Sequence, residues 1–190
     1  VSVLEEELFD QAPADAPTFV PSPVGEGAIH AFAGDPLSDV MRLILLEGSR
    51  GEGKTSCAIV AHLVLADALI RAGLAAKLPY ITAVVRDTHV NLLRTTIPTF
   101  RELARMGLPL RIVGQGDEAI IEQDGLETNR FVFFGLDRPA DADRLQGFTC
   151  GCLWIEEAAP AADFSGGVAP EARGIGAPSV RPAGVPPRIL

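Results

Sequence analysis

Eight consecutive residues of this chain have the types and the spacing of a phosphate-binding loop. They match the pattern G-x-x-x-x-G-K-[ST] at every fixed position and are Gly48, Ser49, Arg50, Gly51, Glu52, Gly53, Lys54 and Thr55. Glycines allow backbone N–H groups to surround a polyphosphate, the Lys54 amine can reach its terminal phosphates, and the Thr55 hydroxyl can ligate Mg²⁺. We therefore predict a nucleoside triphosphate site with Mg²⁺ here, and we add the next residue, Ser56, to the nucleotide-binding set.

The segments on either side of the loop favour this interpretation over an ordinary glycine turn. Residues 40–46 are a short, mainly apolar run, which is typical of a strand buried on both faces. Residues 55–72 are rich in Ala and Leu and contain no Gly or Pro, so they predict a helix. A bound phosphate would then lie at the N-terminus of a helix, where free N–H groups and the helix dipole favour negative charge.

A pair of carboxylates follows a second apolar strand. Residues 152–155 are apolar, and Glu156 and Glu157 come directly after them. One carboxylate at such a strand end can approach Mg²⁺, and its neighbour can polarise an attacking water. Because side chains alternate along a strand, both can serve one site only if the strand has ended. We predict that Thr55 and Glu156 bind the metal, Glu156 either directly or through a water, and that Glu157 is catalytic. The alternative is two solvated acids.

Three arginines are candidates for the positive group that a triphosphatase places on the transferred phosphoryl group. Arg50 lies within the loop, Arg144 lies shortly before the acidic strand, and Arg86 ends the second predicted strand. An arginine on a surface loop is usually only a solvated charge. We therefore prefer Arg50 first, Arg144 second and Arg86 last as catalytic residues.

Strands alternate with helices along most of the chain. A second helix is predicted over residues 88–106, and further strands are predicted over residues 80–85, 110–113, 119–122, 130–134, 150–155 and from 185 onward. The segments 110–113 and 119–122 flank turn residues and predict a hairpin or two short edge strands. The alternation predicts an α/β sandwich with a mainly parallel central sheet, in which ligands bind at the carboxyl ends of the strands.

Composition limits the remaining possibilities. The 190 residues can form one domain, and 16 basic against 25 acidic residues give a net charge of −9. An acidic chain is not a general polyanion binder, so any contact with nucleic acid requires a local patch or another part of the protein. Residues 1–36 are rich in Pro, Gly and Glu and predict an N-terminal arm without a core element.

The cysteines and the apolar segments bear on the cellular location. Cys57, Cys150 and Cys152 form no disulfide framework, so we predict buried thiols in a reducing compartment. The N-terminus is acidic and carries no visible secretory signal, and the longest apolar helix is too short to span a bilayer. We therefore expect a cytoplasmic protein without membrane contact.

These motifs together resemble the large subunit of tailed-phage terminases. The similarity rests on the loop with arginine at its third position and on a strand end at residues 84–86 that an amphipathic helix follows. It also rests on F-V-F-F-G-L-D at residues 131–137, R-L-Q-G at residues 144–147 and L-W-I-E-E-A at residues 153–158. These blocks occur in order over roughly residues 40–158. The loop alone is common to very many ATPases, whereas the later blocks in this order are more specific.

The resemblance implies a P-loop NTPase of the RecA/ASCE-like class over residues 37–190, in the bacterial host cytoplasm. It implies an ATP-hydrolysing motor that packages double-stranded DNA into a procapsid. ATP and Mg²⁺ would bind at Lys54 and Thr55, with Glu157 as the catalytic glutamate. Arg50 matches the loop arginine, and Arg144 would act on the nucleotide of a neighbouring subunit. The implied partners are double-stranded DNA, the portal protein, the small terminase subunit and further copies in a ring.

The chain departs from the family in three respects. Glu156 stands where Asp is commoner, and no upstream glutamine motif for adenine recognition is visible. The family's coupling motif and nuclease domain would follow Leu190, so we expect the chain to be a truncated piece without nuclease activity. Two other functions stay open at this point. One is a helicase-like or recombinase-like ATPase that depends on nucleic acid, and the other is a nucleotide-binding assembly module without turnover of its own.

Overall fold

A computed structural model describes residues 20–34, 42–43, 53–137, 143–145, 147–157 and 188–189 of the chain. Within these ranges the side chains of Val24 and of residues 42–43 and 188–189 are not described. Residues 48–52 of the predicted loop, Arg50 among them, lie outside the described residues.

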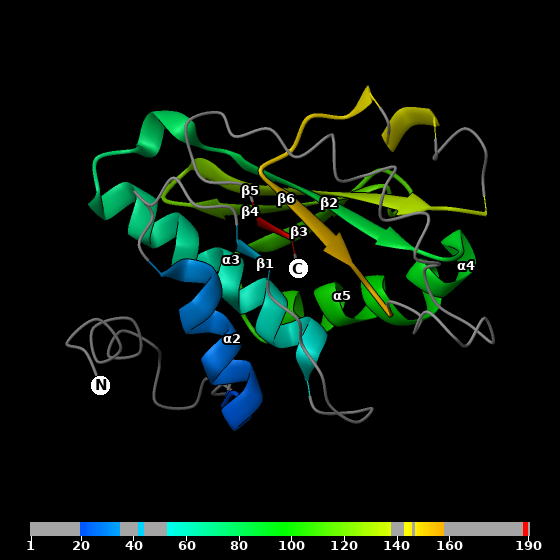
Figure 1. Ribbon diagram of the computed structural model, residues 1–190, viewed down its shortest axis with the longest axis horizontal. Helices are drawn as coiled ribbons and strands as arrows, with labels where there is room; N and C mark the ends of the chain where they lie inside the picture. The colour runs from blue at the N-terminus through cyan, green and yellow to red at the C-terminus, as the bar shows by residue number, and fades with distance from the viewer. Residues whose placement is uncertain are drawn as a thin grey trace.

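The described strands form one sheet in the order β1-β7-β6-β2-β5-β4-β3 (Figure 1). Their bounds are β1 Arg42–Leu43, β2 Tyr80–Arg86, β3 Leu110–Val113, β4 Glu118–Gln123, β5 Leu126–Gly135, β6 Cys152–Ile155 and β7 Arg188–Ile189. The first five strands in this order are parallel, whereas β4 and β3 continue the sheet in antiparallel fashion. The predicted α/β class, the mainly parallel sheet and the 110–122 hairpin are therefore confirmed.

The described helical elements include both helices that the sequence predicts. These elements are α2 Pro23–Ala33, α3 Lys54–Arg71, the short 3₁₀ helix η1 Ala75–Lys77, α4 His89–Asn91, the π-helical turn η2 Leu92–Thr96 and α5 Ile97–Arg105. The last three are continuous and correspond to the helix expected over residues 88–106. The π turn ends two residues before Pro98, which donates no N–H and whose ring displaces the carbonyl four residues earlier, within that turn. None of the described helices is long and apolar enough to cross a membrane.

Apolar side chains pack against both faces of the sheet. Helices α2, α3 and α5 cover one face, where Phe32, Leu65, Phe100 and Trp154 belong to one buried cluster (Figure 1). On the other face the cluster includes residues 83, 85, 132, 134 and 153 of the strands, with Leu145 packed onto them. Apolar side chains are therefore buried on both faces of the sheet. The three cysteines are buried free thiols, as expected.

A buried histidine ties α3 to the middle of the sheet. Nδ1 of His62 lies 2.7 Å from the carbonyl oxygen of Ala58, so this nitrogen carries the proton and donates it. Nε2 lies 2.8 Å from Oγ1 of Thr82 in β2, and the His62 carbonyl accepts a 3.2 Å hydrogen bond from Asn129 in β5. These contacts hold α3 at one position along the strands, and α3 begins with Lys54 and Thr55.

One expectation about residues 1–36 is wrong, because α2 is a core element. Its residue Phe32 is fully buried among α3 and strand side chains. The many prolines and glycines in this region predict an irregular arm. However, Pro23 lies in the first turn of α2, where the N–H groups have no partner within the helix, so its missing N–H costs nothing. Ser22 caps the helix by accepting a 3.2 Å hydrogen bond from the Gly25 N–H.

Strand β5 is longer than the sequence predicts. The expected segment 130–134 is present, but the strand begins at Leu126. Residues Asp124 and Gly125 form a two-residue turn between β4 and β5, with φ angles of 52° and 76°. An Asp-Gly pair between two strands is a strong hairpin signal, and it could have placed the start of β5 correctly.

We expect Gly25→Ala to destabilise the protein by about 1 to 3 kcal/mol, which is the usual cost of overpacking a dense core. A Cβ at Gly25 would lie 2.1 Å from Sγ of Cys57 and 3.2 Å from its Cβ, because α2 and α3 are in close contact there. Urea unfolding of the purified chain measures the change. Gly27→Ala is the matched control in the same helix, because nothing lies within 4 Å of its added Cβ. That variant should gain roughly 0.5 to 1 kcal/mol, and equal losses in both would contradict the packing argument.

Candidate nucleotide site

The described end of the predicted loop leads directly into α3. Gly53 takes φ 70° and ψ 21°, a left-handed conformation that suits glycine, and α3 begins at the next residue. Lys54 and Thr55 therefore lie in the first turn of an 18-residue helix. The N–H groups of this turn have no partner within the helix, which makes its N-terminus a suitable position for an anion. Ser56 follows in the same turn and is half-buried.

The tertiary structure brings Thr55 and Glu156 together. The Thr55 hydroxyl donates a hydrogen bond of 2.5 Å to Oε1 of Glu156, across 101 residues of sequence. Glu156 is held at the carboxyl end of β6 by its N–H, which donates to the Val85 carbonyl of β2 at 2.9 Å. The end of the glycine loop and the acidic strand end therefore form one site.

Burial raises the pKa of Glu156 above its ordinary value of 4.5. Burial is the largest influence because it disfavours the charged form. The hydrogen bond from Thr55 and the positive charges of Arg86 and Lys54 lower the pKa, whereas the negative charge of Glu157 raises it further. A cation at this point would stabilise the carboxylate that burial disfavours.

The residues present fit Mg²⁺ as that cation. Oγ1 of Thr55 and Oε1 of Glu156 are two oxygen donors that already converge, and Mg²⁺ binds oxygen ligands. The described residues contain no group of three or more His, Cys, Asp or Glu side chains that could enclose a metal. A site with few protein ligands suits Mg²⁺, which usually keeps several waters and binds substrate phosphates.

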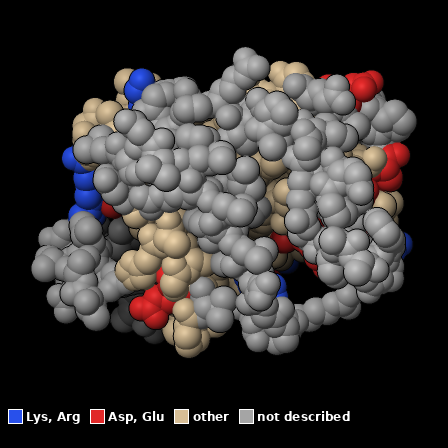
Figure 2. All heavy atoms as spheres, in the orientation of Figure 1, with Lys and Arg blue, Asp and Glu red and all other residues tan. Residues whose placement is uncertain are grey.

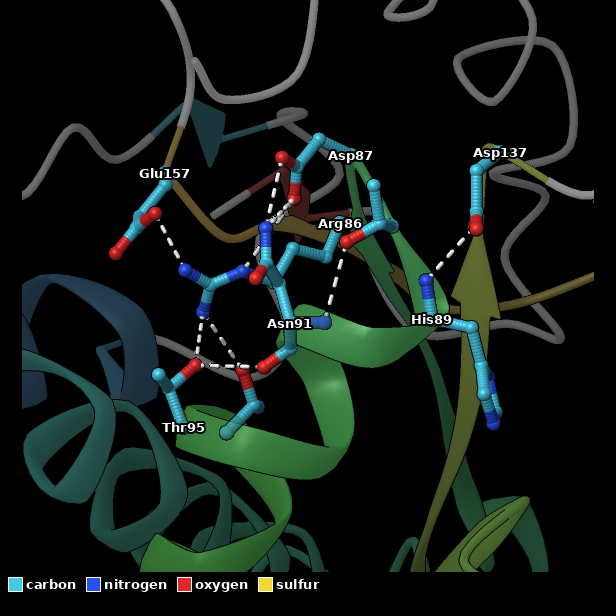
Figure 3. Close-up of polar contacts among 9 residues, drawn as sticks. Arg86, Asp87, His89, Asn91, Thr95, Asp137 and Glu157 are labelled. Atoms are coloured by element: carbon cyan, nitrogen blue, oxygen red, sulfur yellow. Dashed lines mark hydrogen bonds and ion pairs between the residues drawn. The ribbon is translucent and has the colours of Figure 1, made fainter.

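Glu157, the second residue of the acidic pair, forms an ion pair with Arg86 (Figure 3). Strand β6 ends at Ile155, and Glu157 takes a φ of 53°, which is uncommon for a residue other than glycine. Its side chain is 52% exposed, and Oε2 forms the ion pair with the Arg86 guanidinium. Arg86 therefore orients the carboxylate of Glu157 through one of its two oxygens, while the residue as a whole is exposed to solvent.

Arg86 is the central residue of this arrangement. It ends β2, which is paired on both sides, and it is 4% exposed. Besides Glu157, its guanidinium donates to the hydroxyls of Thr95 and Thr96 in the π turn, the latter at 3.2 Å, and lies 3.6 Å from Asp87. Figure 3 shows these groups converging at the carboxyl edge of the sheet. A buried guanidinium with such partners is held in one orientation.

The sequence interpretation ranked Arg86 below Arg50 and Arg144, and it therefore missed the arginine that contacts Glu157. One signal could have identified it: a charged residue closes an otherwise apolar strand at the edge where such sheets bind ligands. Arg144 lies elsewhere. It is exposed, and its guanidinium carbon lies 5.3 Å from the centre of the Phe134 ring, on the face opposite α3. The described contacts do not bring Arg144 to Thr55 or to the glutamates.

We expect Glu156→Gln to make the nucleotide-free protein more stable at neutral pH. Because folding raises the pKa of Glu156, its stabilising contribution is complete below about pH 4.5 and is lost as pH rises through the folded value. Glutamine cannot ionise, so the variant does not lose stability as the pH rises. Its amide oxygen can still accept the hydrogen bond from Thr55. Thermal melts without Mg²⁺ should therefore show a higher melting temperature for the variant at pH 7.5 and no difference near pH 4. A gain of equal size at both pH values would show that ionisation is not its cause.

No family model matches the chain, and no curated protein matches it. Its fold does match that of the large terminase from the thermophilic bacteriophage D6E. One crystal form is 18% identical with a TM-score of 0.58, over 90% of this chain and 39% of the terminase.

Two further structures of the same terminase contain nucleotide. The ADP complex is 16% identical with a TM-score of 0.54, and the ATP-γ-S complex is 17% identical with a TM-score of 0.53. Each match covers 90% of this chain, which spans less than two fifths of the terminase, 38% and 37% respectively. Over most of its length, this chain therefore has the fold of part of a phage large terminase.

Proposed function

We propose that this chain is the ATPase domain of a viral terminase large subunit, a motor that packages double-stranded DNA into a procapsid. The contact between Thr55 and Glu156 carries the proposal. It joins the lysine-threonine end of a phosphate-binding loop to a carboxylate at the end of a neighbouring strand, as hydrolysis of a nucleoside triphosphate with Mg²⁺ requires. The terminase structures with ADP and ATP-γ-S support it, because they combine this fold with a bound nucleotide.

The sheet supports the finer assignment to the P-loop NTPases of the RecA/ASCE-like class. The loop follows β1, the acidic pair follows β6, and β7 lies between these two parallel strands. Helix α3 leads from the loop back along the sheet with two further helices on the same face. These features favour a three-layer nucleotide-binding sandwich, whose ligand lies at the carboxyl ends of the strands.

Each residue of the site has a specific task in the proposed reaction. The amine of Lys54 binds the terminal phosphates of ATP, while Thr55 and Glu156 hold Mg²⁺ by their oxygens. When bound, Mg²⁺ neutralises negative charge on the phosphate oxygens. Glu157 orients the attacking water and accepts its proton, and the ion pair with Arg86 holds the carboxylate by Oε2.

The proposal also includes a positively charged residue for the transferred phosphoryl group and the partners of the motor. Arg50 and Arg144 are the candidates for the positive group on the transferred phosphoryl. The exposed position of Arg144, away from α3, suits a nucleotide bound by a neighbouring copy. A ring of copies would engage the portal protein, the small terminase subunit and double-stranded DNA in the cytoplasm of the bacterial host.

Phosphate release by the full-length protein, assembled with portal and duplex DNA, tests the function. We expect release from ATP to require Mg²⁺ and to stop when a chelator removes it. Thr55→Val should reduce turnover strongly because it removes the hydroxyl, whereas Thr55→Ser keeps the oxygen and should retain most of it. Turnover that is indifferent to chelation, or equal in the two variants, would refute the assigned metal site.

A further inference from the structure

A row of three arginines lies on the outer surface of the helix that follows β2. Arg94, Arg101 and Arg105 are all exposed, whereas Phe100 and Leu103 of the same helix point into the core. Arg101 and Arg105 are four residues apart and therefore neighbours on one side of the helix. Arg94 lies in the π turn that leads into α5, seven residues before Arg101, and it is exposed like the other two. We call these three residues the arginine row.

The guanidinium groups of the arginine row have no polar partner among the described residues. No ion pair or hydrogen bond joins any of the three to another described residue. By contrast, Arg71, Arg111 and Arg130 each pair with a carboxylate. From Thr88 to Met106 the chain has three arginines against one acid, Glu102, although the whole chain carries a net charge of −9. This helix is therefore a local positive feature on an acidic protein.

We propose that the arginine row binds the phosphate backbone of duplex DNA. This inference rests on the proposed function, which supplies DNA as a partner but no surface for it. Arginine is suited to phosphate because its planar fork of donors matches the phosphate oxygens and stays charged at all relevant pH values. From Arg94 to Arg105 the helix rises ~16 Å, a length of duplex that carries roughly ten phosphate charges.

The surroundings of the row favour duplex over single-stranded nucleic acid. Proteins that bind single strands without sequence preference stack the bases on exposed aromatic rings. The exposed large apolar side chains among the described residues are all aliphatic, and the two beside the row are Val90 and Leu93. On the face drawn in Figure 2, the described lysines and arginines that are visible lie in small separate groups. The helix therefore offers charge contacts without a stacking surface.

The salt dependence of DNA binding tests the proposal. The full-length protein is titrated into a labelled duplex of about 30 base pairs, of arbitrary sequence, between ~50 and ~200 mM KCl. Replacing all three arginines by glutamine, as R94Q/R101Q/R105Q, should make the slope of log K against log salt shallower by about 2.7, or 0.9 for each phosphate contact. A second duplex of different sequence should show the same loss, because backbone contacts carry no sequence information.

A matched variant controls for net charge. R71Q/K77Q/R111Q removes the same three positive charges from exposed residues on α3, η1 and β3, and it should keep the wild-type slope. A wild-type slope in the arginine-row variant, or an equal loss in both variants, overturns the proposal. So does a change of sedimentation behaviour with an unchanged slope, since the row would then contact another copy of the chain.

ATP turnover without DNA separates this inference from the proposed function. The arginine-row variant should hydrolyse ATP without DNA at the wild-type rate, because its residues lie outside the nucleotide site. If the wild-type protein binds DNA through the row but hydrolyses no ATP, the proposed function fails and the inference stands. If it hydrolyses ATP while DNA binding ignores the row, only the inference fails.

Discussion

Glu157→Gln should reduce ATP turnover by about 10²- to 10⁴-fold, the usual contribution of a positioned general base. Glutamine has nearly the same shape but cannot accept a proton from water. The Arg86 guanidinium can still donate to the amide oxygen, so the unusual backbone of residue 157 should persist. ATP binding should remain because Lys54, Thr55 and Glu156 are unchanged. Single-turnover phosphate release and equilibrium binding of labelled ATP measure the two effects separately.

The control for Glu157→Gln is Glu102→Gln, which makes the same chemical change at an exposed position on α5. That variant should turn over ATP at the wild-type rate. If Glu157→Gln also hydrolyses ATP at the wild-type rate, Glu157 is not the base. If ATP binding falls together with turnover, its role lies in holding the site together instead of in the chemistry.

Lys54→Ala should weaken the binding of ATP by about 10- to 100-fold, since hydrogen bonds to charged groups contribute roughly 1.5 to 3 kcal/mol. The lysine lies in the first turn of α3 beside Thr55, and no other described residue takes its place at the helix N-terminus. Turnover at saturating ATP should also fall, because the charge on the transferred phosphoryl group loses one of the cations that stabilise it. Calorimetric titration with ATP and Mg²⁺ measures the affinity.

Lys77→Ala provides the comparison for Lys54→Ala. Lys77 is an exposed lysine in η1, beyond the far end of α3. It carries the same charge, so its loss reproduces any general electrostatic effect on an acidic protein that binds an anion. Affinity that falls equally in both variants would exclude a specific contact between Lys54 and the phosphates.

Most of the fold could be predicted because its signals are local. The apolar strand predicted over residues 80–85 and the helix predicted over residues 88–106 are visible as runs and periodic patterns, and both occur in the structure. The errors arose where packing overrides composition. Helix α2 was predicted to be an irregular arm, because the chain does not reveal that Gly25 faces Cys57 and that Phe32 enters the core.

In the candidate site, too, local sequence signals and tertiary packing determined different features. By itself, the sequence determined the chemistry that is available: a lysine and a threonine after a glycine loop, and two carboxylates after an apolar strand. These depend on residue type and on spacing along a short segment. Only the tertiary structure decided which groups meet. It placed Thr55 against Glu156, 101 residues apart, and Arg86 against Glu157. The physical reason is that β2 and β6 are neighbours in the sheet, so the groups at their carboxyl ends share one partly buried edge.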